Sequence, residues 1–127
     1  SNVFDTTRLT PAIFGNEPTH DRCYYFEKAD LAYQLQDWQL AVDLYHQAIQ
    51  SGYVNWMDTE LVPFIGSFAH LNEWEFAYSL TERMANKTDK SLIPVICSLW
   101  KSLEKDTPDG INKKESLMRI STTYGCQ

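Results

Sequence analysis

The chain has 127 residues, the length of one ordinary domain, and 43% of them are hydrophobic and 13% aromatic. This composition excludes a disordered chain, because disordered segments are poor in aromatic residues. Seventeen Asp and Glu against eleven Lys and Arg give a formal net charge of −6. The tightest basic cluster, 112–119, is interrupted by Glu115. We therefore expect no nucleic acid partner, since a polyanion would be repelled.

No apolar stretch is as long as the roughly 20 residues that a membrane-spanning helix needs. The longest candidate runs from Ser91 to Trp100 and contains Pro94. The sequence therefore predicts a soluble piece, with membrane attachment only through a segment upstream of it.

The first elements are a lead-in and a helical hairpin. Residues 1–19 contain two prolines and a glycine and predict an extended linker before a single helical domain at 20–127. From there, apolar residues recur at spacings of three and four, first up to Gln36 and again from Trp38 to Gly52. This spacing predicts two amphipathic helices with almost no linker, which must pack antiparallel as a hairpin over 21–52. Asp21 is expected to cap the first helix and Gly52 to end the second.

The same pattern returns 36 residues later and predicts a second hairpin over 58–86. Seven pairs of mainly apolar residues correspond at this offset: Tyr25 and Leu61, Ala29 and Ile65, Ala32 and Phe68, Trp38 and Trp74, Ala41 and Ala77, Leu44 and Leu80, Ala48 and Met84. Small residues such as alanine let two helix axes approach closely where they cross. We therefore expect these alanines at the helix crossings and the two tryptophans buried at the hairpin ends.

A third, irregular hairpin is predicted over 89–122. Its first helix, from Ser91 to Lys105, has a broad apolar face, and Pro94 is tolerated if it lies in the first turn. The stretch 106–110 predicts a turn, and a last helix from Asn112 to about Thr122 carries Leu117, Met118 and Ile120 toward the stack as a cap.

The three cysteines form neither a disulfide framework nor a zinc site, because their number is odd and no CxxC spacing occurs. Cys23 and Cys97 are expected to be buried as small apolar residues. Pairing of Cys126 with Cys97 stays open, because the sequence supplies no geometry that would decide it.

The positions Ala29, Trp38, Ala41, Tyr45 and Ala48 resemble those of the tetratricopeptide-repeat family, whose usual period is about 34 residues. In the second unit the corresponding residues are Ile65, Trp74, Ala77, Thr81 and Met84. The resemblance implies an all-α, tetratricopeptide-like right-handed stack of antiparallel helical hairpins, with about six helices and a C-terminal capping helix.

A narrower resemblance covers Cys23 to Thr81. The stretches "CYYFEKADLAYQLQDW" and "PFIGSFAHLNEWEFAYSLT" are similar to the soluble C-terminal tail of bacterial multi-spanning membrane proteins of the lipid-linked glycosyltransferase type. This resemblance implies attachment to a membrane enzyme, and it implies no catalytic residue in this domain.

We expect no enzyme activity, no cofactor and no metal. The histidines are His20, His46 and His70, and only His20 with Cys23 approaches a metal-ligand spacing. Ser67 lies within a helical pattern and lacks the strained turn of a serine nucleophile. The carboxylates of Asp106 and Asp109 lie in a turn, where they are solvated.

In tetratricopeptide arrays the first helix of each hairpin lines a concave groove. Carried over to this chain, the resemblance places eight residues in that groove: Phe26, Asp30, Tyr33, Gln34, Val62, Gly66, Ala69 and His70. Aromatic rings beside acidic groups favour a protein or peptide partner with basic character. Two interpretations stay open, because the third hairpin could fill the groove and leave these residues as core.

Two functions are compatible with the sequence. The first is a non-catalytic protein-interaction module, the soluble appendage of a bacterial membrane protein, with a free cytoplasmic adaptor as the other location. The second is an accessory domain of a membrane-bound glycosyltransferase-like enzyme, in which Trp38, Trp74, Tyr33 and Tyr53 hold a sugar or lipid head group. Burial of both tryptophans would count against the second function.

Overall fold

The computed structural model describes residues 20–85 and 90–127. They form six α-helices and one short 3₁₀ helix, and no strand occurs in this part of the chain. The elements are α2 (Arg22–Gln34), α3 (Trp38–Gln50), α4 (Val62–His70), α5 (Trp74–Ala85), η3 (Lys90–Leu92), α6 (Ile93–Asp106) and α7 (Ile111–Tyr124). The predicted all-α class is therefore confirmed. The predicted lead-in at 1–19 and the end of the second hairpin after Ala85 lie outside the described residues.

Local capping explains where the first two helices begin and end. A side-chain oxygen of Asp21 accepts a hydrogen bond from the backbone N–H of Tyr24 at 2.9 Å, which satisfies one free donor at the start of α2. Asp37 does the same for Leu40 at 3.2 Å at the start of α3. Gly52 follows the end of α3 with a φ of 92°, a left-handed conformation that glycine adopts without strain. Asp21 and Gly52 have the roles that the sequence predicts.

The turns inside the first two hairpins have the same backbone geometry. Gln36 has a φ of 61° and Asn72, at the equivalent position, a φ of 66°. In the first turn the N–H of Asp37 donates to the carbonyl oxygen of Ala32 at 2.8 Å, and in the second the N–H of Glu73 donates to that of Phe68 at 2.9 Å. The 36-residue offset read from the sequence therefore recurs in the backbone hydrogen bonds of the turns.

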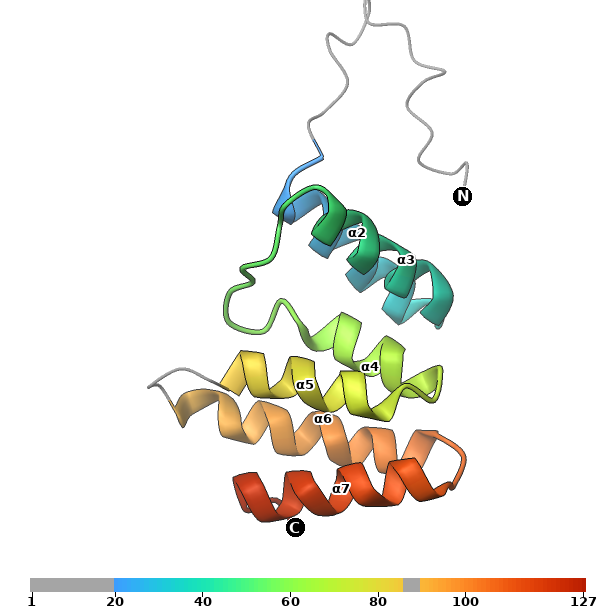
Figure 1. Ribbon diagram of the computed structural model, residues 1–127, viewed down its shortest axis with the longest axis vertical. Helices are drawn as coiled ribbons and strands as arrows, with labels where there is room; N and C mark the ends of the chain where they lie inside the picture. Colours follow the sequence, from blue (N-terminus) through green and yellow to red (C-terminus); the bar gives the residue numbers. More distant parts are fainter. Residues whose placement is uncertain (1–19, 86–89) are drawn as a thin grey trace, which may run out of the picture.

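The helices stack in chain order along the long axis of the molecule, from α2 and α3 at one end to α7 at the other (Figure 1). α4 lies against both α2 and α3, and α6 with η3 lies against α4 and α5. The helix that begins each new hairpin therefore packs against the hairpin before it. The last helix, α7, lies against α5 and α6. Right-handed, tetratricopeptide-like stacking stays a prediction.

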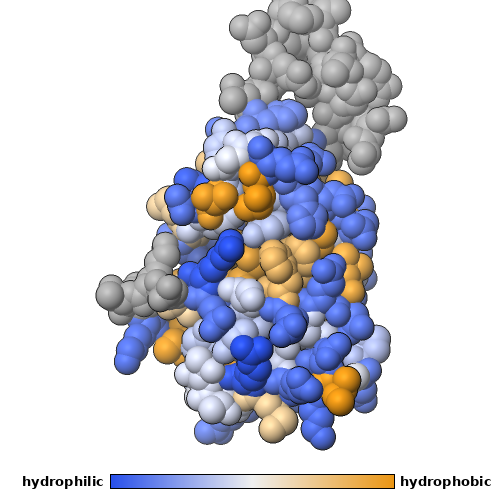
Figure 2. All heavy atoms as spheres, viewed as in Figure 1, coloured by the Kyte–Doolittle hydropathy of each residue, from blue (hydrophilic) through white to orange (hydrophobic). Residues whose placement is uncertain are grey.

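The core follows the predicted stripes. Of the seven residue pairs that correspond at the 36-residue offset, every member is buried except Trp38, which is half-buried. Ala41 and Ala77 have no exposed surface, so a larger side chain at either position would meet its neighbours. On the face seen in Figure 2, hydrophobic side chains gather where the first hairpin meets α4, and hydrophilic ones cover most of the remainder.

The predicted burial of Cys23 and Met118 was wrong, and Trp38 and Cys97 are half-buried where burial was predicted. Cys23 is exposed, because the buried stripe of α2 runs through Tyr25, Ala29 and Ala32 and leaves position 23 on another side of the helix. In α7, Met118 is 61% exposed, although it was expected to face the stack. α7 buries Lys113, Ser116 and Ile120 in a different stripe, and it extends to Tyr124, two residues beyond the predicted end.

Candidate functional site

The eight residues of the predicted groove lie on α2 and α4, which are neighbours in the stack. Gly66 and Ala69 are buried, and the other six are half-buried or exposed. The Tyr33 ring lies so close to Gly66 that a methyl group at position 66 would overlap it. We call this surface the α2–α4 face. The packing of Tyr33 on the backbone of α4 closes this face beside Gly66.

Three aromatic rings lie together at one end of the α2–α4 face, two of them stacked and the third edge-on. Trp38 and His70 are stacked with ring centroids 3.7 Å apart, and the Tyr33 ring lies 5.3 Å from that of Trp38. The Nδ1–H of His70 donates to the carbonyl oxygen of Gly66 at 2.8 Å, which fixes the tautomer and the orientation of the ring. Burial raises the pKa of the Tyr33 hydroxyl, and the nearby Asp106 carboxylate raises it further. These rings cover one another and form one cluster.

The open part of the α2–α4 face is polar. Asp30 is half-buried and accepts a hydrogen bond from the side-chain amide of the exposed Gln34 at 3.0 Å. At the other end of the face, Arg22 forms an ion pair with Glu60 at 3.2 Å. The face therefore offers a partner mainly charged and amide groups beside the half-buried Phe26.

A second surface, which the sequence analysis missed, is a groove of about 630 Å³ between α6 and α7 at the end of the stack. Trp100 and Ile120, each 1% exposed, lie at its floor. Its walls include the half-buried Leu117 and two exposed apolar side chains, Ile111 at 74% and Met118 at 61%. We call this surface the end groove. A preformed, mostly apolar groove with a few polar groups has the character of a binding site.

The corner between α6 and α7 is fixed by a buried lysine. The ammonium of Lys113 donates to the carbonyl oxygens of Glu104 at 2.7 Å and of Thr107 at 2.8 Å, and lies 3.6 Å from the Asp109 carboxylate. Helical continuation would pair the Glu104 carbonyl with the N–H of residue 108, but that residue is Pro108 and has none. Lys113 supplies the missing donor, and its positive charge suits the C-terminal end of α6.

A disulfide closes the other end of the groove. Cys97 of α6 is bonded to Cys126, with the two Cα atoms 5.3 Å apart. The Ser121 hydroxyl donates to the Cys126 carbonyl oxygen at 2.6 Å and also holds the tail. This outcome answers the question that the sequence left open and corrects the expectation that Cys97 is an unpaired buried thiol. The end groove is therefore held at both ends, by a buried lysine and by a covalent bond.

The residues weighed for catalysis are spread over the stack. Ser67 has no exposed surface, and its hydroxyl finds no hydrogen-bond partner in the described part of the chain. His20 is stacked on Tyr24 with ring centroids 3.9 Å apart. Asp106 accepts from the Ser102 hydroxyl at 3.2 Å, while Asp109 lies beside Lys113. No group of three or more His, Cys, Asp or Glu able to hold a metal ion occurs among the described residues.

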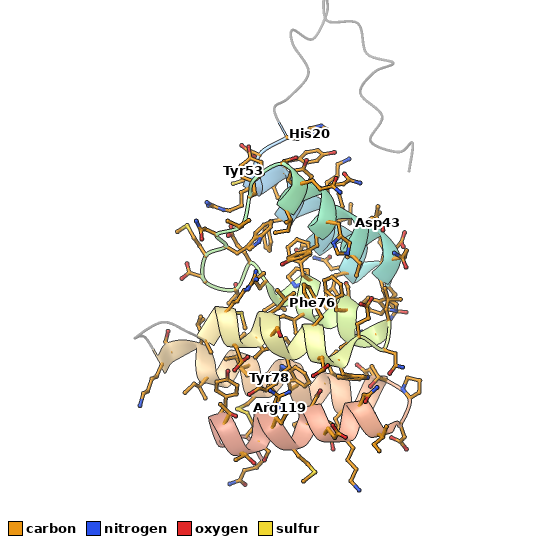
Figure 3. All side chains as sticks on the ribbon, in the orientation of Figure 1. His20, Asp43, Tyr53, Phe76, Tyr78 and Arg119 are labelled. Carbon is orange, nitrogen blue, oxygen red and sulfur yellow. A yellow bond between two sulfur atoms is a disulfide. The ribbon has the colours of Figure 1, made fainter. Side chains whose placement is uncertain are left out.

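The aromatic residues considered as a sugar platform differ in exposure. Trp74 is 2% exposed and lies beside Trp100, with ring centroids 5.7 Å apart. Trp38, Tyr33 and Tyr53 are half-buried. The labelled Tyr53 lies near His20, at the end of the stack opposite to α7 (Figure 3). Trp74 therefore offers no face to a ligand.

Comparison of the chain with protein-family models, with curated proteins and with solved structures gave no match in any of the three. No helix in residues 20–85 and 90–127 has the length and apolar character needed to cross a membrane. The functional interpretation therefore depends on the residues and geometry described above.

Proposed function

We propose that this domain is a non-catalytic helical-repeat module that binds another protein, and that it is the soluble appendage of a bacterial membrane protein. The observation that carries the proposal is the end groove. Its exposed apolar walls lie over a floor that is closed to solvent, at the position where a stack of hairpins can accept another element.

The construction of the end groove supports binding without large rearrangement. Lys113 fixes the corner between α6 and α7, and the disulfide fixes the tail. A groove held in this way loses little conformational freedom when a partner enters it, so more of the contact energy is available for affinity.

The disulfide also bears on the location of the domain. Structural disulfides persist in oxidising compartments and are rare in the cytosol of most organisms. Within the proposal, the Cys97–Cys126 bond favours a domain that faces the periplasm or the cell exterior over a cytoplasmic adaptor.

The second candidate, an accessory domain that recognises a sugar or lipid head group, has less support. It needs a flat aromatic surface open to the ligand, and Trp74 is buried while Trp38 is stacked on His70. The half-buried Tyr53 is the remaining member of that platform away from the Tyr33, Trp38 and His70 rings.

Site-specific photocrosslinking in the source organism tests the proposal. A photoreactive amino acid at Met118 or at Ile111, in the end groove, should give an adduct with one defined protein on irradiation. The matched control carries the same amino acid at Asp43, an exposed position on α3 far from α7 (Figure 3). Rebinding of the purified partner should be lost with Met118→Glu. Adducts with glycans or lipids alone, or no adduct at either groove position, would overturn the proposal.

A further inference from the structure

The shape of the end groove indicates what it binds. The lining residues of α6 are Cys97, Trp100, Lys101 and Glu104, and those of α7 include Ile111, Lys114, Met118 and Ser121. On each helix they recur at intervals of three, four or seven residues, so they form one stripe along the helix axis. The groove therefore runs parallel to both helices, over about 10 to 15 Å at a rise of about 1.5 Å per residue. That length matches two to three turns of a bound helix.

The stack itself provides the template for the occupant. α4 lies against both helices of the first hairpin, and α6 with η3 lies against both helices of the second. In the first case one helix lies across the hairpin, and in the second α6 lies against α4 while η3 and α7 lie against α5. The end groove lies on the α6–α7 hairpin. Its helix α7 is the last element of the stack (Figure 1). A helix fits the end groove in the same way, because ridges of side chains on one helix pack into the grooves of its neighbours.

The charged residues around the end groove indicate which kind of amphipathic helix it binds. Residues 20–85 hold three Lys and Arg against ten Asp and Glu, whereas residues 90–127 hold six against four. At the groove, Lys101 and Lys114 are exposed, and neither forms an ion pair within the described part of the chain. The lining also holds Glu104 and the exposed Asp109, which lies 3.6 Å from the buried Lys113, so three lysines stand against two carboxylates. The groove lining therefore has a net charge of +1 on a protein whose formal net charge is −6.

We propose that the end groove binds an amphipathic α-helix of a partner protein, with an apolar stripe two to three turns long and acidic flanks. The stripe contacts Ile111, Leu117 and Met118, and the acidic flanks lie beside Lys101 and Lys114. This inference rests on the proposed function, since it names the kind of protein partner that the interaction module takes.

Two synthetic peptides of equal length test the inference. Both carry the same leucines at helical spacing and glutamine elsewhere, with four glutamates in one and four lysines in the other. Binding to the full, disulfide-intact chain is measured by fluorescence anisotropy at low and high salt. The glutamate peptide should bind about tenfold more tightly at low salt, because two exposed pairs replace two like-charge contacts. The difference should shrink at high salt.

Three variants locate the site. Met118→Glu should weaken binding of the glutamate peptide by at least about tenfold, because it places a charge in the apolar wall. Leu35→Glu is the matched control, because Leu35 is a 71% exposed leucine on the first hairpin, and binding should be unchanged. Lys101→Glu with Lys114→Glu should reverse the preference between the two peptides. Both substituted lysines are exposed, so these variants should remain folded.

Several results would overturn the inference. One is equal affinity for the two peptides, and another is tight binding of a peptide with the same composition but scrambled leucine spacing. A third is self-association of the chain that is lost in Met118→Glu, because the groove would then bind a second copy of the chain. Photocrosslinking at position 118 could capture a protein while neither helical peptide binds. That result would support the proposed protein-interaction function and exclude an acidic helix as the partner.

Discussion

The two junctions between successive hairpins are built from different interactions. Between the first and second hairpins, Tyr45 of α3 lies among Phe64, Phe68 and Phe76, with ring centroids 5.3 to 5.7 Å apart. Between the second and third, the Trp100 Nε1–H donates to the Thr81 hydroxyl at 3.0 Å, and that hydroxyl donates to the Ala77 carbonyl oxygen at 2.8 Å. The first junction is aromatic at its centre, with the part-buried Arg22–Glu60 ion pair and an Arg83–Tyr45 hydrogen bond beside it, whereas the second has fully buried hydrogen bonds.

The same contrast holds within the hairpins. The first two are closed by turns of equal geometry and by small residues at the crossings, so both depend on tight packing. The third is held by Lys113 and by the Cys97–Cys126 bond. Arg119 also links it to the second hairpin, because its guanidinium lies over the Tyr78 ring, 3.9 Å from the centroid (Figure 3). The comparison indicates that packing stabilises the first two units, and that specific bonds stabilise the unit with the end groove.

The largest effect should come from the disulfide. Replacing both Cys97 and Cys126 by serine should lower the free energy of unfolding by about 3–4 kcal/mol, because the bond closes a long loop in the unfolded chain. Cys23→Ser is the matched control, and its effect should be within about 0.5 kcal/mol because Cys23 is exposed and unpaired with another cysteine. Urea unfolding monitored by circular dichroism measures both. Equal stability of the two variants would remove the contrast between the third hairpin and the others.

Overpacking tests the first two hairpins. Ala41→Leu or Ala77→Leu should each lower the free energy of unfolding by about 1–3 kcal/mol, because a buried site with no free space must accept a larger side chain. Gln47→Leu, on the exposed side of α3, serves as the control and should change stability little. Thermal unfolding unaltered in both alanine variants would contradict the hairpin packing described here.

The buried lysine should contribute less. Lys113→Met should lower the free energy of unfolding by about 1–2 kcal/mol, because two buried carbonyl oxygens lose a donor while the cost of burying a charge is relieved. Lys114→Met changes the neighbouring exposed lysine and should have an effect within about 0.5 kcal/mol. Hydrogen exchange at the end of α6 should rise in the first variant alone. Equal exchange in both would show that Lys113 does not hold the corner.

The smallest change in stability is expected from glycine substitutions in the two equivalent turns. Gln36→Gly should raise the free energy of unfolding by about 0.5–1 kcal/mol, because a left-handed conformation costs a residue with a Cβ more than it costs glycine. Asn72→Gly should give a smaller gain, because asparagine tolerates that conformation. Denaturant titrations of both variants give the two values. A larger gain at Asn72 than at Gln36 would show that strain is distributed differently in the two turns.

The sequence predicted the first two hairpins well because their signals are local or repeated. Asp21 as a cap, Gly52 as a stop and the stripe spacings depend on neighbours in the chain. The 36-residue offset then predicted the second hairpin from the first. Even the departure at Thr81, which replaces the equivalent of Tyr45, has a physical reason, because the Trp100 indole donates to its hydroxyl.

The third hairpin could be predicted only in outline, because its decisive contacts join residues far apart in sequence. Burial of Lys113 depends on Pro108 leaving a carbonyl oxygen of α6 without a donor, and a lysine on a helix is ordinarily solvated. The sequence signal for the end groove is the pair Ile111 and Met118, two apolar residues seven positions apart and therefore on one side of α7. The sequence pattern predicts a helix from Asn112 with Met118 facing the stack, which leaves Ile111 out of the helix and Met118 off the surface.

The closeness of the two buried indoles, Trp74 in α5 and Trp100 in α6, has an optical consequence. Their ring centroids are 5.7 Å apart and their planes are inclined by 45°. At that separation the electronic transitions of two indoles couple and give paired circular dichroism bands of opposite sign in the ultraviolet. The coupling exists only while the third hairpin is seated on the second, so the amplitude of these bands reports that seating separately from the helix content of the chain.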